Sequence, residues 1–213
     1  MLAEAIWVLP ACLALVDWYA VARGDRRTES WAKPLVLASL VATAAFLGAT
    51  ASAAGIWLLV ALVFALAGDV ALLSDSLPRF RMGLLAFLVG HLAYLVCFAL
   101  LGLTVPAWSW IGVAVLGAAL WATRAVVPAT HRLDGWALSV PVAVYSVVIG
   151  AMLLSAWFTG APLVALGATV FVVSDATLSV DRFVRPVPHA RLVLMVTYHV
   201  GQALIVAGAV AAA

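Results

Sequence analysis

Charged residues are scarce in this chain. Only 9% of its 213 residues are Asp, Glu, Lys or Arg, whereas 67% are hydrophobic, and the mean hydropathy is +1.21. A soluble domain carries about 25% charged residues and about 45–50% apolar ones. This composition cannot cover an apolar core with a water-facing surface, so it indicates an integral membrane protein. It also leaves no basic face that would suit nucleic acid, and we expect none as a partner.

Short motifs of several enzyme classes are also missing. The chain contains no GxSxG nucleophile elbow, no HExxH zinc motif and no Walker phosphate loop. Its two cysteines, Cys12 and Cys97, fall inside apolar runs. That placement favours small buried side chains over a disulfide framework.

Long apolar runs make up most of what remains. A helix needs about 20 apolar residues to cross roughly 30 Å of hydrocarbon, and these runs lack the period-2 alternation of a barrel. Turn-forming Gly, Pro, Ser and Asp separate the runs. We therefore expect one all-α integral membrane domain over residues 1–213, a bundle of eight transmembrane helices at about 3–23, 33–51, 55–74, 81–102, 107–127, 135–157, 161–180 and 189–211.

The first run resembles a signal peptide, because residues 20–22 are small, as at a cleavage site. However, no Lys or Arg precedes Trp18, and Glu4 stands where the basic n-region of a signal peptide belongs. We therefore expect residues 3–23 to be the first membrane span.

Basic residues are confined to alternate connections. All eleven Lys and Arg fall at the connections after the first, third, fifth and seventh expected spans, and none falls after the second, fourth or sixth. The positive-inside rule places such loops in the cytoplasm. We expect a multi-pass protein of the cell membrane with cytoplasmic basic loops and both termini outside.

A weak internal repeat relates the third and fourth expected spans to the seventh and eighth. Residues 64–69 (FALAGD) resemble residues 170–175 (VFVVSD), and RF recurs at 79–80 and 182–183. One interpretation is a 4+4 duplication. The other interpretation is that GD and SD recur by chance, because the spacing between the matching motifs differs by several residues in the two segments.

Three acids lie inside expected spans, namely Asp17, Asp69 and Asp175. A charged Asp at a helix centre costs about 2.5–3.5 kcal/mol on insertion scales, and such groups usually face the bundle interior and serve a function. All three fall in the cytoplasmic half, roughly 10 Å below the interface at about 1.5 Å per residue. The alternative is a polar network that only joins helices. Asp17, nearest a span end and beside Trp18 of an expected interface belt, is the weakest candidate.

Further polar side chains enter from the same side to a similar depth. His91 and Tyr94 share a helix face, and so do Tyr198 and Gln202. His199 points about 100° away from Tyr198, so we expect only one of these two side chains to face a shared cavity.

Asp69 and His91 are expected to lie opposite one another, since each is eleven residues from Phe80 in the turn between two antiparallel spans. A metal bound by Asp69, His91, Asp175 and His199 is conceivable by ligand type. No tight ligand spacing supports it, so we expect neither a metal nor another cofactor.

Three more residues are candidates for binding. Tyr145 follows Pro141 by four residues, which predicts a kinked helix that offers a hydroxyl. Lys33 could extend to the interface, pair with an acid, or meet a lipid phosphate. Ser174 precedes Asp175, but nothing marks it as a nucleophile.

Several motifs occur together in a fixed order along the chain. They are FxxxGD ending at Asp69, RFxxGLxxFxxGHxxY from Arg79, FxxSDxxLxxxRF from Phe171, and a TYxxxQ-like ending from Thr197. In this order the chain resembles the YhhN family, whose animal members are the TMEM86 lysoplasmalogenases. His199 and the sparse match in the first and fifth spans depart from the pattern.

The resemblance implies hydrolysis of the vinyl ether bond of lysoplasmalogens, lysophospholipids that would enter from the inner leaflet. Such a reaction calls for one protonated acid and one carboxylate, a division of labour also found in glycosidases. We expect Asp69 and Asp175 to be this pair, without choosing the acid. The other expected site residues are His91 in catalysis and, in substrate binding, Lys33, Tyr94, Tyr145, Ser174, Tyr198 and Gln202. A small proton-coupled transporter and a non-catalytic lipid-binding protein are the alternatives.

Overall fold

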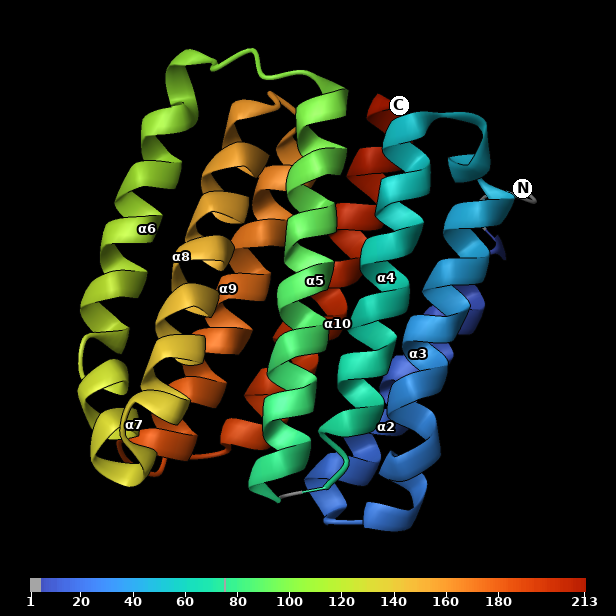
Figure 1. The fold of residues 1–213 in the computed structure, drawn as a ribbon. Helices are drawn as coiled ribbons and strands as arrows, with labels where there is room; N and C mark the ends of the chain where they lie inside the picture. The colour runs from blue at the N-terminus through green and yellow to red at the C-terminus, as the bar shows by residue number, and fades with distance from the viewer. Residues whose placement is uncertain (1–4, 75) are drawn as a thin grey trace.

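The computed structural model describes residues 5–74 and 76–213, so Glu4 and the start of the expected first span lie outside it. Within these ranges every regular element is helical, which confirms the all-α prediction. The helices are α2 (Val8–Arg23), α3 (Arg26–Phe46), α4 (Ala53–Ala71), α5 (Leu77–Leu101), α6 (Trp110–Thr123), α7 (Val126–Asp134), α8 (Trp136–Phe158), α9 (Pro162–Phe183) and α10 (Ala190–Ala212), with short 3-10 turns η1 (Ala49–Ala51) and η2 (Ala107–Ser109). The long helices form one bundle (Figure 1).

Six helical segments are long and apolar enough to cross a membrane. They are α4, α5, the segment Ala107–Asp134 that contains α6 and α7, α8, α9 and α10. The α2 helix has 16 residues, and α3 carries four charged residues among its first eight, so neither meets the same criteria. Six segments therefore have the length and composition of membrane-spanning helices, and membrane crossing by α2 and α3 stays a prediction.

The expected fifth span, 107–127, does not continue as one helix. The α6 helix ends at Thr123, and a separate short helix, α7, begins at Val126. Pro128 explains the break, because its ring would clash with the carbonyl of residue 124 and it has no N–H to donate there. In the first turn of a new helix the same proline is tolerated. The expected connection to the next span is thus largely helical.

One end of the bundle collects the basic residues. The α2–α3, α4–α5 and α9–α10 connections and α7 all lie at the bottom of Figure 1, and the C-terminus lies at the opposite end. The eleven Lys and Arg belong to these connections and to the adjoining helical turns. We call this the basic end. The segregation seen along the sequence is therefore also a segregation in space.

Both cysteines are free. Cys97 is buried, as expected, whereas Cys12 is exposed on α2, so the expectation for Cys12 is wrong. An apolar run in a membrane helix contains outward-facing residues as well as packed ones, and composition alone does not separate them.

The α9 and α10 helices approach closely through glycine. A Cβ added to Gly201 would lie 2.9 Å from the Phe171 nitrogen and 3.0 Å from the Gly167 oxygen, so backbone meets backbone here. Small residues allow such contacts between membrane helices. Because α9 carries Asp175 and α10 carries Tyr198, the contact holds two parts of the candidate site together.

Gly201→Ala should therefore destabilise the protein by about 1–3 kcal/mol, the usual effect of overpacking a tight contact. Thermal unfolding of the purified protein in detergent measures the effect. Gly117→Ala is the matched control, since nothing lies within 4 Å of a Cβ at that position. Alanine favours helix over glycine, so this control should be neutral or stabilising. Equal behaviour of the two variants would show that the contact is not tight.

Candidate active site

A large cavity opens in the half of the bundle nearer the basic end. It contains about 1060 Å³ of empty space, counting the part that opens to the exterior. Residues of α3 to α10 form its mostly apolar wall. Its polar and charged lining residues are Lys33, Asp69, Thr123, Tyr145, Ser146, Ser174, Asp175, Ser179 and Tyr198. A concave apolar space with a few convergent polar groups is the usual form of a small-molecule site.

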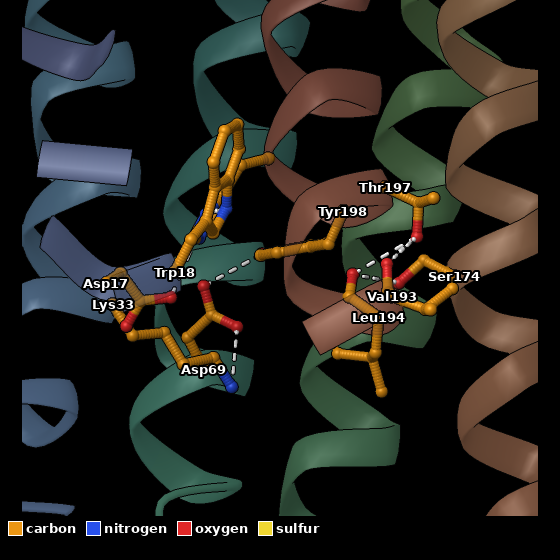
Figure 2. Close-up of polar contacts among 10 residues, drawn as sticks. Asp17, Trp18, Lys33, Asp69, Ser174, Val193, Leu194, Thr197 and Tyr198 are labelled. Atoms are coloured by element: carbon orange, nitrogen blue, oxygen red, sulfur yellow. Dashed lines mark hydrogen bonds and ion pairs between the residues drawn. The ribbon is translucent and has the colours of Figure 1, made fainter. Parts of the chain in front are cut away.

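Asp69 lines this cavity and has two partners. Its Oδ1 is 3.2 Å from Lys33 Nζ, and its Oδ2 accepts a hydrogen bond of 2.8 Å from the Tyr198 hydroxyl (Figure 2). All three side chains are buried. Of the three possibilities for Lys33, the structure shows the pairing with an acid. Extension to the interface is wrong, because the ammonium group is enclosed beside a carboxylate.

Asp175 has a different set of contacts. Its Oδ2 accepts a hydrogen bond from the Tyr145 hydroxyl, which α8 supplies. The α8 helix runs unbroken through Pro141, from Trp136 to Phe158. Among the described residues no Lys, Arg or His pairs with Asp175, and its side chain stays partly exposed on the cavity wall.

The cavity therefore presents two separate acid–tyrosine pairs. Asp69 is bonded to Tyr198, and Asp175 is bonded to Tyr145. Within the described part of the chain, no hydrogen bond joins the two carboxyl groups to each other. Such an arrangement can give and accept protons at two places on a bound molecule.

Three expected site residues lie behind the cavity wall. Tyr94 donates a hydrogen bond to the Gln202 Oε1, and this buried contact ties α5 to α10. The His91 ring packs edge-on against Tyr145, at 5.2 Å between centroids, and against Phe171 at 5.1 Å.

The sequence analysis placed His91 opposite Asp69, but no hydrogen bond joins these two side chains. Both of its ring nitrogens lack a hydrogen-bond partner among the described residues. Its ring packs against Tyr145, the hydrogen-bond partner of Asp175, so His91 can influence Asp175 through that tyrosine.

Ser174 lines the cavity, but its hydroxyl is engaged elsewhere. It donates a hydrogen bond of 3.0 Å to the Leu194 carbonyl and so links α9 to α10 (Figure 2). The metal alternative finds no support either. In the described ranges no three His, Cys, Asp or Glu side chains gather closely enough to hold an ion.

One polar cluster was missed by the sequence reasoning. Asp17 is fully buried. The Trp18 indole N–H donates a hydrogen bond of 3.1 Å to His199 Nδ1, and the place of Trp18 in an interface belt stays a prediction. The donor and the acceptor are 181 residues apart, and no local pattern announces their contact. The expectation that only one of Tyr198 and His199 faces the large cavity is confirmed, and that residue is Tyr198.

Fold and site together define a multi-helix membrane protein with an acidic cavity. The chain belongs to the YhhN family, whose pattern it matches over residues 28–209. It is 43% identical over 65 residues to "Lysoplasmalogenase TMEM86B" of Homo sapiens, covering 30% of this chain and 28% of that protein. It is 48% identical over 44 residues to "Lysoplasmalogenase TMEM86A" of Bos taurus, covering 21% of this chain and 18% of that protein. The matched stretches thus span less than a third of these relatives, and no solved structure matches the chain.

Removing one partner of the buried Lys33–Asp69 pair should destabilise the protein strongly. Lys33→Met leaves a buried carboxylate without its cation, which typically costs about 3–5 kcal/mol. Adding Asp69→Asn should recover much of the loss, because the uncompensated charge disappears. Equilibrium unfolding of the single and double variants in detergent tests this.

Arg81→Met is the control for that experiment. It breaks an ion pair with Asp134 in which both side chains are about 40% exposed, and exposed pairs contribute about 0–1 kcal/mol. If Lys33→Met costs no more than Arg81→Met, the buried pair is not an important constraint on the fold.

Proposed function

We propose that this protein is a membrane-embedded hydrolase that cleaves the vinyl ether bond of lysoplasmalogens. The products are a fatty aldehyde and a glycerophospho-ethanolamine or glycerophospho-choline. The observation that carries the proposal is the pair of aspartates, each bonded to a tyrosine, on the wall of one largely apolar cavity. The names of the related animal proteins support the choice of substrate.

Vinyl ether hydrolysis needs an acid and a base in sequence. A proton adds to the vinyl carbon farther from oxygen and leaves an oxocarbenium ion at the other carbon. Water attacks that carbon as a carboxylate takes its proton, and the resulting hemiacetal collapses to aldehyde and alcohol. General acid and base groups each contribute about 10²–10⁴-fold to such reactions.

The partners of the two aspartates suggest which one is the acid. Lys33 lies 3.2 Å from Asp69, and an ammonium group attracts a carboxylate in its ionised form. Asp175 has only the neutral Tyr145 hydroxyl as its hydrogen-bonding partner among the described residues. We therefore assign Asp175 as the proton donor and Asp69 as the carboxylate that stabilises the cation and activates water.

The substrate chain fits the apolar extension of the cavity. Leu116 and Leu120 of α6 and Ile149 of α8 line this part, and Leu120 is 54% exposed on the outer surface, which offers a lateral entrance from lipid. The head group then points toward the basic end. Because Lys33 is engaged by Asp69, we assign the phosphate to arginines of that end.

Remaining expected residues take supporting roles in this proposal. His91 positions Tyr145 through ring packing, and the Tyr94–Gln202 bond holds α10 in place against α5. The Ser174 hydroxyl on α9 also holds α10, through its hydrogen bond to the Leu194 carbonyl. Tyr145 and Tyr198 each donate a hydrogen bond to one of the two aspartates that react with substrate.

We also propose the membrane arrangement that this function requires. All eight expected segments cross the cell membrane, the basic end faces the cytoplasm and both termini lie outside. The segregation of Lys and Arg supports this orientation. Substrate then enters from the inner leaflet. The pairing of α4 with α5 and of α9 with α10 as close neighbours is compatible with a 4+4 duplication.

Asp69→Asn and Asp175→Asn should each lower kcat/KM for aldehyde release by at least about a thousandfold, as expected for loss of a general acid or base. The assay follows aldehyde formation by the purified protein with a lysoplasmalogen. Asp134→Asn, which changes an acid of the exposed Arg81 pair, is the control and should keep full activity. Normal aldehyde release by either site variant, correctly folded, would refute the two-carboxylate mechanism.

Leu120→Trp should narrow the chain-binding part of the cavity. Loss of contact with about two methylene groups, at about 0.8 kcal/mol each, predicts a roughly tenfold rise in KM for long-chain substrate. Steady-state kinetics with a long and a short alkenyl chain measure it, and the short chain should be less affected. Val113→Trp is the control, because Val113 is an exposed α6 residue outside the cavity. Equal KM values for both variants would place the chain elsewhere.

A further inference from the structure

A second cavity lies on another side of α10, where α2, α3 and α10 meet. It holds about 480 Å³ of empty space, counting its open part. Along α2 it reaches from Trp7 to Trp18, about 16 Å at about 1.5 Å per residue. We call it the α2/α10 groove. Its wall is apolar except for the His199 imidazole and the indoles of Trp7 and Trp18.

The hydrogen bond from Trp18 fixes the proton on His199. An indole N–H can only donate, so the Nδ1 that receives it at 3.1 Å must be unprotonated. The neutral ring therefore carries its proton on Nε2. Asp17 does not compete for either nitrogen, since its Oδ2 is 3.9 Å from Nδ1 and has no hydrogen-bond partner among the described residues.

This leaves a buried donor without an acceptor. His199 is 2% exposed, lines the groove, and its Nε2 has no partner in the described part of the chain. Buried N–H groups are nearly always hydrogen-bonded. The unpaired donor thus points to a ligand that brings its own acceptor.

The shape and charge of the groove narrow the class of ligand. The unpaired His199 donor lies near one end, beside Trp18, and the lining residues between this end and Trp7 are apolar. No Lys or Arg is among its lining residues, so a phosphate or carboxylate would gain no cationic partner. Val200 on its rim is 36% exposed, which leaves a side entrance from the lipid phase.

We propose that the α2/α10 groove binds a neutral, single-chain lipid such as a fatty alcohol or fatty aldehyde. Its oxygen accepts a hydrogen bond from His199 Nε2, and its chain extends along α2 toward Trp7. The groove lies directly behind the acid site, because the His199 ring is 5.3 Å from that of Tyr198, the partner of Asp69. That the natural occupant is the aldehyde product rests on the proposed function, whereas binding of this class of lipid does not.

Photolabelling of the purified full chain in detergent tests the proposal. The probe is a hexadecanol analogue with a diazirine on its chain, and the comparison probe is the same chain without the hydroxyl. Peptide mapping should find labels on α2 and α10, about tenfold more with the alcohol than with the hydrocarbon, the ratio expected for one hydrogen bond to a buried donor. Unlabelled hexadecanal should compete.

Two variants test separately whether labelling depends on the His199 hydrogen bond and on the open space of the groove. His199→Phe keeps a flat ring but removes the donor, so alcohol labelling should fall to the hydrocarbon level. Ala203→Trp fills the groove from a partly exposed position and should reduce labelling by both probes. Val193→Trp is the control, as it adds the same bulk at an exposed α10 position outside the groove and should change nothing.

Equal labelling by both probes, label spread over all lipid-facing helices, or unchanged labelling in Ala203→Trp would overturn the proposal. The Ala203→Trp result decides the matter even if His199→Phe fails to fold. Labelling does not depend on catalysis. A protein that is labelled in the groove but releases no aldehyde would retain this site and lose only the proposed function.

Discussion

The buried ion pair between Lys33 and Asp69 constrains the geometry of the whole site. Each charge removed from water costs several kcal/mol, and only close, well-oriented partners offset that cost. Lys33 comes from α3, Asp69 from α4 and the second donor, Tyr198, from α10. These three helices must therefore meet at one point in the half nearer the basic end. All three side chains line the large cavity, to which α8 and α9 contribute Tyr145 and Asp175.

Two identical side chains, Asp69 and Asp175, have different surroundings in the cavity. Asp69 has a cation and a tyrosine hydroxyl, one on each oxygen, whereas Asp175 has a tyrosine alone and faces the cavity. If the two segments descend from a duplication, the copies have diverged in their partners more than in their acids. The α9 helix carries Asp175 and the α10 helix carries Tyr198. The close contact between these helices at Gly201 holds the two side chains in a fixed relation.

The sequence predicts what depends on one helix at a time. Apolar runs predicted the helices, and the cost of burying an acid singled out Asp17, Asp69 and Asp175 before any contact was known. Pro128 carried the signal for the break before α7, but the apolar run around it concealed that signal. Contacts between distant helices could not be predicted, because they depend on how each helix is rotated in the bundle. For this reason the partner of Lys33, the direction of His91 and the bond between Trp18 and His199 emerge only from the fold.

Helix geometry also explains how one helix serves two cavities. Adjacent residues on a helix point about 100° apart, so Tyr198 faces the acid site while His199 faces the α2/α10 groove. The large cavity contains charge and opens in the half nearer the basic end, which suits a molecule with a phosphate. The groove offers the unpaired His199 donor and a mostly apolar wall, which suits a neutral lipid. In the reaction that we propose, cleavage separates a charged head group from a neutral aldehyde, and α10 lies between the two environments.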